Sequence, residues 1–103
     1  MDATIFNDAL TMSLEWGENF HKPIQGRVCS AYPAISQAEA DELNGVCRGL
    51  AFYAFEQIER AYLKQITRAE ADANIMARYP LVNADSMAQL WSRGQYYAWH
   101  DNG

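Results

Sequence analysis

The sequence is poor in the residues on which most enzyme and metal chemistry depends. Its 103 residues include two histidines, His21 and His100, and two cysteines, Cys29 and Cys47. The chain therefore has neither a CxxC pair nor the paired cysteines of a zinc site. It also lacks glycine-rich phosphate loops and the HExxH and GxSxG strings. We expect no cofactor and no catalytic site, and we interpret the cysteines as unpaired thiols in a reducing cytosol.

Long apolar runs and clusters of positive charge are missing as well. The densest apolar run covers positions 50–55, far short of the ~20 residues that a membrane-spanning helix needs. The start of the sequence carries an acid at position 2 and does not resemble a signal peptide. The eight Lys and Arg residues are scattered and the net charge is −5, which disfavours direct nucleic-acid binding. We therefore expect a cytoplasmic protein that contacts neither a membrane nor nucleic acid.

Capping signals and helical periodicity predict four helices. Capping boxes at Ser36–Glu39 and Thr67–Glu70 predict helices over residues 36–66 and 68–78, because each side chain can bond the other residue's backbone N–H. A fourth helix is predicted over 84–99, with Asn83 or Asp85 as its cap. A first helix is predicted over 4–20 from apolar residues at helical spacing, with Trp16 on its inward face.

The segment 21–35 shows no helical pattern, and proline at position 23 marks the end of the preceding helix. Loops of this length in compact domains are uncommon unless they are functional or disordered. Because this one contains Ile24 and Val28, we expect it to be ordered over the other helices, with Arg27 and Tyr32 as candidate contacts for a partner. The predicted fold is an all-α, compact, four-helix bundle-like single domain over residues 1–103, with this long ordered loop between the first and second helices.

The helix predicted over 36–66 is apolar on most sides, which indicates a central helix packed by several neighbours. Gly45 and Gly49 are predicted to be the point where another helix approaches it closely, since two glycines at this spacing remove side-chain bulk. In the short helix over 68–78, the inward residues are predicted to be Ala69, Ala73, Met76 and Ala77.

The last eleven residues, RGQYYAWHDNG, contain more rings than one helix face can bury. With Gly94 placed inward at 100° per residue, an apolar arc points to the core: Met87, Leu90, Trp91, Tyr97 and Ala98. Tyr96 and Trp99 point the other way, with Arg93 and His100 beside them. Tyr, Trp and Arg are enriched at binding hot spots. We expect these four residues to bind a partner, unless the long loop or the central helix covers the rings.

Two enzyme readings remain as alternatives. Glu18 and His21 form one Glu-x-x-His motif, whereas di-iron four-helix proteins need two such motifs and two further glutamates. Cys29 and His21 could form a nucleophile and base, but the sequence shows no third group to orient them. These alternatives depend on half-motifs at a predicted helix end.

The hypothesis that the sequence favours is a small acidic, non-catalytic module that acts by occupying the surface of a partner protein. In size and charge alone it is similar to immunity proteins and phage-encoded inhibitors of host defence. A partner with a basic, nucleic-acid-binding groove would suit the negative charge. Mimicry of DNA is less favoured, because most acids lie where helix dipoles favour them. Homo-oligomerisation, for example a homodimer, through the aromatic residues is a further alternative.

Overall fold

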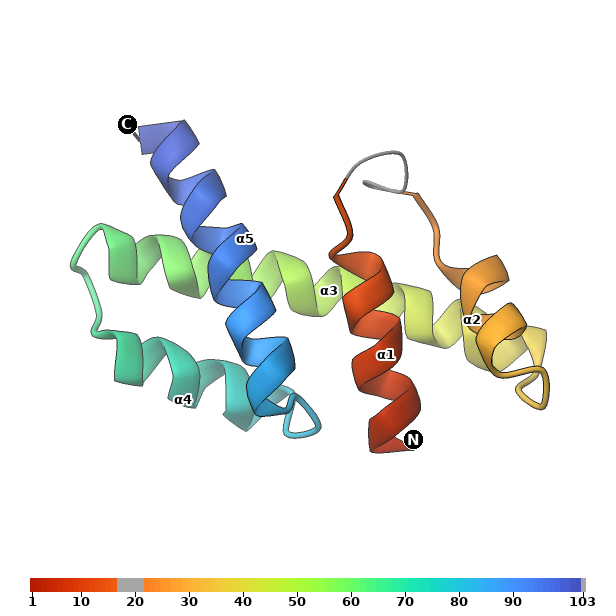
Figure 1. Cartoon of the computed structure of the whole chain (residues 1–103). Helices are drawn as coiled ribbons and strands as arrows, with labels where there is room; N and C mark the ends of the chain where they lie inside the picture. Colours follow the sequence, from red (N-terminus) through yellow and green to blue (C-terminus); the bar gives the residue numbers. More distant parts are fainter. Residues whose placement is uncertain (17–21, 103) are drawn as a thin grey trace.

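The computed structural model describes residues 1–16 and 22–102, and this part of the chain is helical, without strands (Figure 1). The helices are α1 (Ala3–Ser13), α2 (Gln25–Ala31), α3 (Gln37–Tyr62), α4 (Arg68–Arg78) and α5 (Ala84–Asn102). The all-α, single-domain prediction is confirmed, with five helices described rather than four. None of these helices combines the length and apolarity that crossing a bilayer requires.

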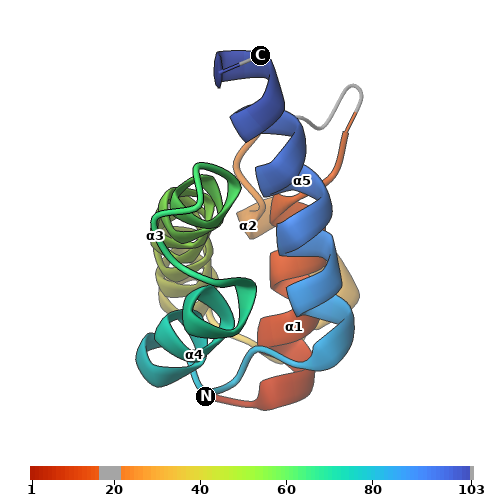
Figure 2. The same cartoon turned by 90° about the vertical axis from the view of Figure 1, so that its left-hand side faces the viewer.

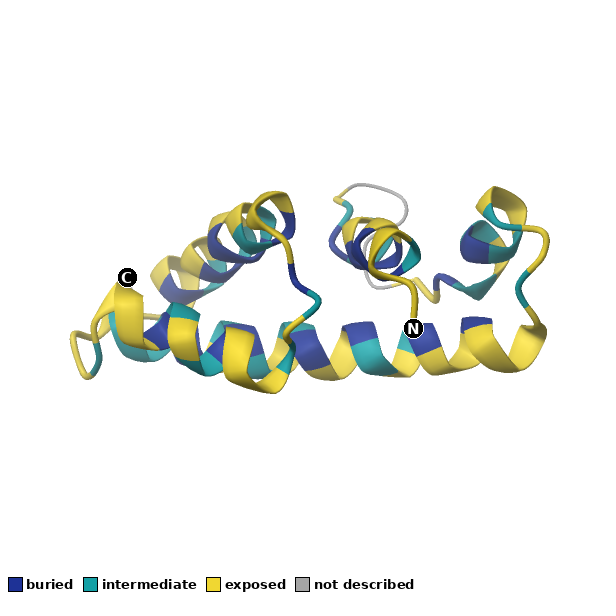
Figure 3. Ribbon diagram, turned by 90° about the horizontal axis from the view of Figure 1, so that it is seen from below, coloured by how far each residue is buried: buried dark blue, intermediate teal, exposed yellow. Residues whose placement is uncertain are grey.

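The long helix α3 is the centre of the structure, as predicted, and it contacts each of the other four helices. Helix α4 lies beside α3 in one layer, whereas α1, α2 and α5 lie across one side of α3 in a second layer (Figure 2). Buried residues of α3 face this second layer and the opposite side of α3 is exposed (Figure 3). The result is an elongated molecule of 43 × 29 × 19 Å.

The predicted helix starts at Ser36 and Thr67 are confirmed. The Glu39 backbone N–H donates to Ser36 Oγ at 3.1 Å, and the Glu70 N–H donates to Thr67 Oγ1 at 3.1 Å. Both glutamates accept a bond back from the cap residue, which completes each capping box. The bond from the Thr67 backbone lowers the pKa of the Glu70 carboxyl. Helix α5 is capped by Asn83, whose Oδ1 accepts from the Ser86 N–H at 2.8 Å.

The predicted end of the first helix is wrong, because α1 ends at Ser13 rather than at residue 20. Two arginine side chains donate hydrogen bonds to backbone carbonyl oxygens at this end of the helix. Arg27 Nη1 donates to Met12 O at 3.1 Å, and Arg93 Nε donates to Leu14 O at 2.9 Å. These long-range donors help fix where the helix ends, and apolar periodicity carries no signal of them. Positions 17–20 of the predicted helix lie outside the described residues.

The segment predicted to lack helical structure contains α2, which is a second correction. This helix has seven residues, and its N-cap Ile24 has no side-chain cap bond. Ile24 and Val28, one turn apart, are buried, while the Ile24 N–H donates to Asn44 Oδ1 of α3 at 3.2 Å. Packing against α3 therefore supports a helix too short to be recognised from periodicity. For residues 22–35, the prediction that the segment is ordered over the other helices is confirmed.

The close approach between helices occurs at Gly94 and not at the predicted pair Gly45 and Gly49. Gly45 is exposed, and a Cβ atom built there would meet nothing within 4 Å. A Cβ atom at Gly94 would lie 2.8 Å from Ile58 Cδ1 and 3.0 Å from its Cγ2. The absent side chain thus allows α5 to pack directly against α3.

The inward face of α4 was also wrongly predicted. Ala71 and Ile75 are buried, whereas the residues predicted to face inward are exposed: Ala69, Ala73, Met76 and Ala77. Alanines are spread round this helix, so their spacing says little about which side is buried. The single isoleucine is the better guide, because a larger apolar side chain gains more from burial.

Asn7 is a buried polar residue that joins α1 to the chain before α5. Its Nδ2 donates to Ala3 O and to Leu81 O, each at 2.8 Å. Its Oδ1 accepts from the Asn83 N–H at 3.1 Å and from Ser86 Oγ at 2.7 Å. One side chain therefore satisfies three groups that lie more than 70 positions away in the sequence.

Replacing Gly94 with alanine is expected to destabilise the fold by about 1–3 kcal/mol, because the new Cβ overlaps Ile58. Gly45→Ala is the matched control. It should stabilise α3 by about 0.5–1 kcal/mol, since alanine favours a helix and finds open space there. Urea unfolding followed by circular dichroism measures both changes. A Gly94→Ala variant at least as stable as the wild type would contradict the close contact.

Replacing Asn7 with alanine is expected to cost about 2–4 kcal/mol of unfolding free energy, since Leu81 O and the Ser86 hydroxyl lose their partner inside the protein. Ser86→Ala removes one bond only and should cost about 1 kcal/mol. Thermal and urea unfolding of the two variants should therefore rank them clearly. Equal losses would show that Asn7 does not act as a junction of several bonds.

Candidate functional site

Aromatic side chains gather on the outer side of α5 and around the end of α1. The ring of Tyr96 lies 5.4 Å from that of Trp16 in a T-shaped contact, 6.3 Å from Trp99, and 6.1 Å from His100 in a stacked one. Tyr96 remains 47% exposed, Trp99 59% and Trp16 41%. We call Trp16, Tyr96, Trp99 and His100 the aromatic surface. The predicted exposure of Tyr96 and Trp99 is confirmed.

Arg93 lies beside this surface, as predicted, but its guanidinium group is used within the chain. Its Nε donates to Leu14 O at 2.9 Å, and its Cζ lies 4.8 Å from the centre of the Trp16 ring. This cation–π contact and the hydrogen bond hold the chain after α1 against α5. Arg93 is half-buried at the edge of the aromatic surface. Its role there is to position Trp16.

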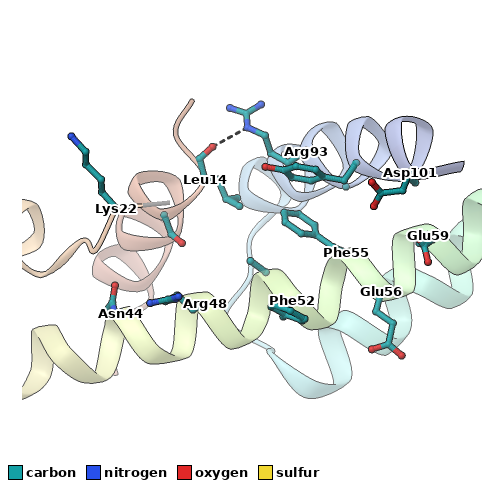
Figure 4. A pocket seen from close by; sticks show the side chains of 15 residues that line it. Leu14, Lys22, Asn44, Arg48, Phe52, Phe55, Glu56, Glu59, Arg93 and Asp101 are labelled. Carbon is teal, nitrogen blue, oxygen red and sulfur yellow. Dashed lines mark hydrogen bonds between the residues drawn. The ribbon is translucent and has the colours of Figure 1, made fainter. Parts of the chain in front are cut away.

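A groove of about 590 Å³ lies next to the aromatic surface, between α3, α5 and the end of α1 (Figure 4). Its apolar lining comes from all three: Leu14, Ala51, Phe52, Phe55, Tyr97 and Ala98. Phe52 is 84% exposed. Tyr97 connects the groove to the aromatic surface, because it lines the groove and its ring lies 5.7 Å from that of Tyr96. Partial burial raises the pKa of the Tyr97 hydroxyl.

Charged residues of opposite sign line the two ends of the groove. Lys22, Arg48 and Arg93 lie toward one end, and Glu56, Glu59 and Asp101 toward the other (Figure 4). Glu59 Oε2 accepts a long bond of 3.4 Å from Asn102. The groove thus combines an apolar lining with a cationic and an anionic end.

The other two predicted contacts, Arg27 and Tyr32, do not join this site. The Tyr32 hydroxyl donates to the Asp8 carboxylate, and this bond raises the pKa of Tyr32. Arg27 Nη1 forms an ion pair with Glu15 at 3.0 Å. Both side chains fasten α2 to the α1 region, and α2 lies on the other side of α1 from α5 (Figure 1).

The residues of the alternative enzyme readings are only partly described. Glu18 and His21 lie outside the described residues. Among residues 1–16 and 22–102, no group of three or more His, Cys, Asp or Glu could hold a metal ion. Cys29 is half-buried and Cys47 is buried, and neither forms a disulfide. Burial raises the pKa of the Cys47 thiol to about 12, so this thiol stays protonated at neutral pH.

Sequence reasoning missed Trp16, Phe52 and the charged ends of the groove. Trp16 was predicted on the inward face of a longer helix, and its position depends on Arg93, a residue 77 positions away. Phe52 did carry a signal, because it falls off the buried stripe of α3. The groove itself had none, since it requires knowing where α5 crosses α3.

Comparisons of the chain with models of known protein families, with curated proteins and with solved structures found no significant match.

The Cys47 thiol is expected to be unreactive in the folded protein. In a Cys29→Ser variant, Ellman's reagent at mildly alkaline pH should label no thiol until denaturant is added, because Cys47 is buried and protonated. The reciprocal Cys47→Ser variant is the control, since Cys29 is partly accessible. Rapid labelling of Cys47 without denaturant would contradict its place in the core.

Proposed function

We propose that this protein is a non-catalytic module that binds a partner protein through the aromatic surface and so occupies the partner's own surface. The observation that carries the proposal is that the ring of Tyr96 packs against both Trp16 and Trp99 on the outside of the molecule, and that all three rings remain 41–59% exposed. Tyr and Trp dominate hot spots because they offer large areas at a small loss of side-chain freedom.

Contacts within the chain support this role, because they hold the rings before a partner arrives. Tyr96 is flanked by Trp16, Trp99 and His100, and Trp16 is held by Arg93. A side chain that is already ordered loses less entropy on binding than a mobile one. The aromatic surface therefore combines the composition of a tight interface with contacts that hold its rings in place.

The negative charge supports a more specific form of the proposal. With a net charge of −5, the protein would associate fastest with a positively charged partner, such as one with a basic nucleic-acid-binding groove. An inhibitor or immunity-type protein of the cytoplasm fits this description, and two thiols without a disulfide are ordinary in that compartment.

The proposal is tested by replacing Tyr96 and Trp99 together with alanine. Wild-type and variant proteins are immobilised and exposed to an extract of cells that naturally make the protein, and bound proteins are identified by mass spectrometry. The variant should keep its helical circular dichroism and bind the captured partner at least about tenfold more weakly, as expected when two hot-spot rings are removed.

Tyr62→Ala with Leu63→Ala is the matched control. These two side chains are also large, apolar and exposed, but they lie at the C-terminal end of α3 and are not part of the aromatic surface. This control should capture the partner like the wild type. Undiminished capture by the Tyr96/Trp99 variant would refute the proposal, as would unfolding of that variant. Light scattering over a concentration series separates self-association: a wild-type dimer that the aromatic substitutions dissociate would identify a second copy as the occupant.

A further inference from the structure

The α3 wall of the groove is one continuous stripe of the helix. Its lining residues recur at intervals of one, three and four positions: Asn44, Arg48, Ala51, Phe52, Phe55, Glu56 and Glu59. Such residues share one side of a helix. From position 44 to 59 the stripe extends about 22 Å at 1.5 Å per residue, or about four helical turns. The wall is therefore as long as a typical helix of a globular protein.

The α5 wall has the same apolar middle and the same anionic end. It continues from Gly94 through Tyr97 and Ala98 to Asp101, whereas the Arg93 guanidinium at its start is engaged by Leu14 O and the Trp16 ring. The cationic end of the groove is therefore supplied by Lys22 and Arg48, and the anionic end by Glu56 and Glu59 of α3 together with Asp101 of α5 (Figure 4). The charges of the groove thus change sign along the direction of α3.

The middle of the groove has room for side chains from another molecule. Ala51 and Ala98 have small side chains, while Phe52 is left 84% exposed at the groove's edge. Neither Arg48 nor Glu56 has an ion-pair partner among the described residues. The apolar middle and the unpaired charges at its ends are thus both available to a ligand.

We propose that this groove receives one amphipathic helix of the partner protein, with acidic residues over the Lys22 and Arg48 end and basic residues over the Glu56, Glu59 and Asp101 end. The inference rests on the proposed function and specifies the chemistry of the partner. An amphipathic helix in an apolar groove anchors itself by residues spaced three and four apart, which matches a four-turn wall. Charge complementarity at both ends sets its orientation.

This occupant fits better than a small molecule, although the groove's volume is within the range of small-molecule sites. Arg48 and Glu56 are eight positions apart, which is about 12 Å along α3. One helix can place opposite charges over both ends at once. A helix with acids in its first turn and bases in its last is also stabilised by its own dipole, and it would lie parallel to α3.

The test uses three fluorescently labelled synthetic peptides of about 15 residues, long enough for four helical turns. All have the same apolar face. The first has acidic residues at its N-terminal end and basic ones at its C-terminal end, the second has acids at both ends, and the third has bases at both ends. Fluorescence anisotropy measures their affinity for the whole protein. The wild type should bind the first peptide at least about tenfold more tightly than either of the others.

Two charge-reversal variants should change this preference in opposite ways. Lys22→Glu with Arg48→Glu should prefer the peptide with bases at both ends. Glu56→Lys with Glu59→Lys should prefer the peptide with acids at both ends. The second and third peptides carry the same charge at both ends, so this result does not depend on the direction in which a peptide lies in the groove. Glu42→Lys with Asp85→Lys is the matched control for the second of these variants, since it changes the net charge equally at exposed positions outside the groove.

Equal affinity for the three peptides, no binding of any of them, or preferences that the groove variants leave unchanged would overturn the inference. So would a dimer of the wild type that the groove variants dissociate, because the occupant would then be a second copy. If the peptides fail while Tyr96→Ala with Trp99→Ala still abolishes capture of the partner, the aromatic surface stands and the groove does not. If the protein prefers the peptides as expected but the Tyr96→Ala with Trp99→Ala variant still captures the partner as well as the wild type does, the proposal for the aromatic surface is refuted and the groove proposal stands.

Discussion

The crossing of α5 over α3 at Gly94 determines where the α5 side chains of the candidate site lie relative to α3. Ile58 occupies the space where a Cβ atom of residue 94 would lie, so the two helix backbones approach closely there. The residues after Gly94 form one wall of the groove and stay in contact with α3, as the 5.3 Å between the rings of Phe55 and Tyr97 shows, and the outer side of the same helix carries Tyr96 and Trp99. A larger residue at the crossing would move both features together.

The aromatic surface and the groove are adjacent and are connected by shared residues. Tyr97 lines the groove and touches the ring of Tyr96 outside it, while Arg93 lines the groove and holds Trp16 in place. A partner could therefore contact the rings and the groove in one continuous interface. Its strength would come from the rings, and its specificity from the order of charges along the two walls.

Local signals in the sequence predicted much of the fold. Ser36 and Thr67 begin helices because their caps involve residues only three positions away. The end of α1 and the existence of α2 were missed because they depend on donors and acceptors far along the chain, namely Arg93, Arg27 and Asn44. For the site, the outward direction of Tyr96 followed from helix geometry alone. The groove did not, because it exists only where separate helices meet.

The junction at Asn7 has a consequence for how the molecule is made. Its partners Leu81, Asn83 and Ser86 are synthesised long after α1 has left the ribosome. Until then the buried amide has no tertiary bonds, and the first helix is attached only through its earlier contacts with the α2 region and α3. Nascent chains that stop before position 86 would leave the first helix loosely attached, a state that quality-control proteases could recognise.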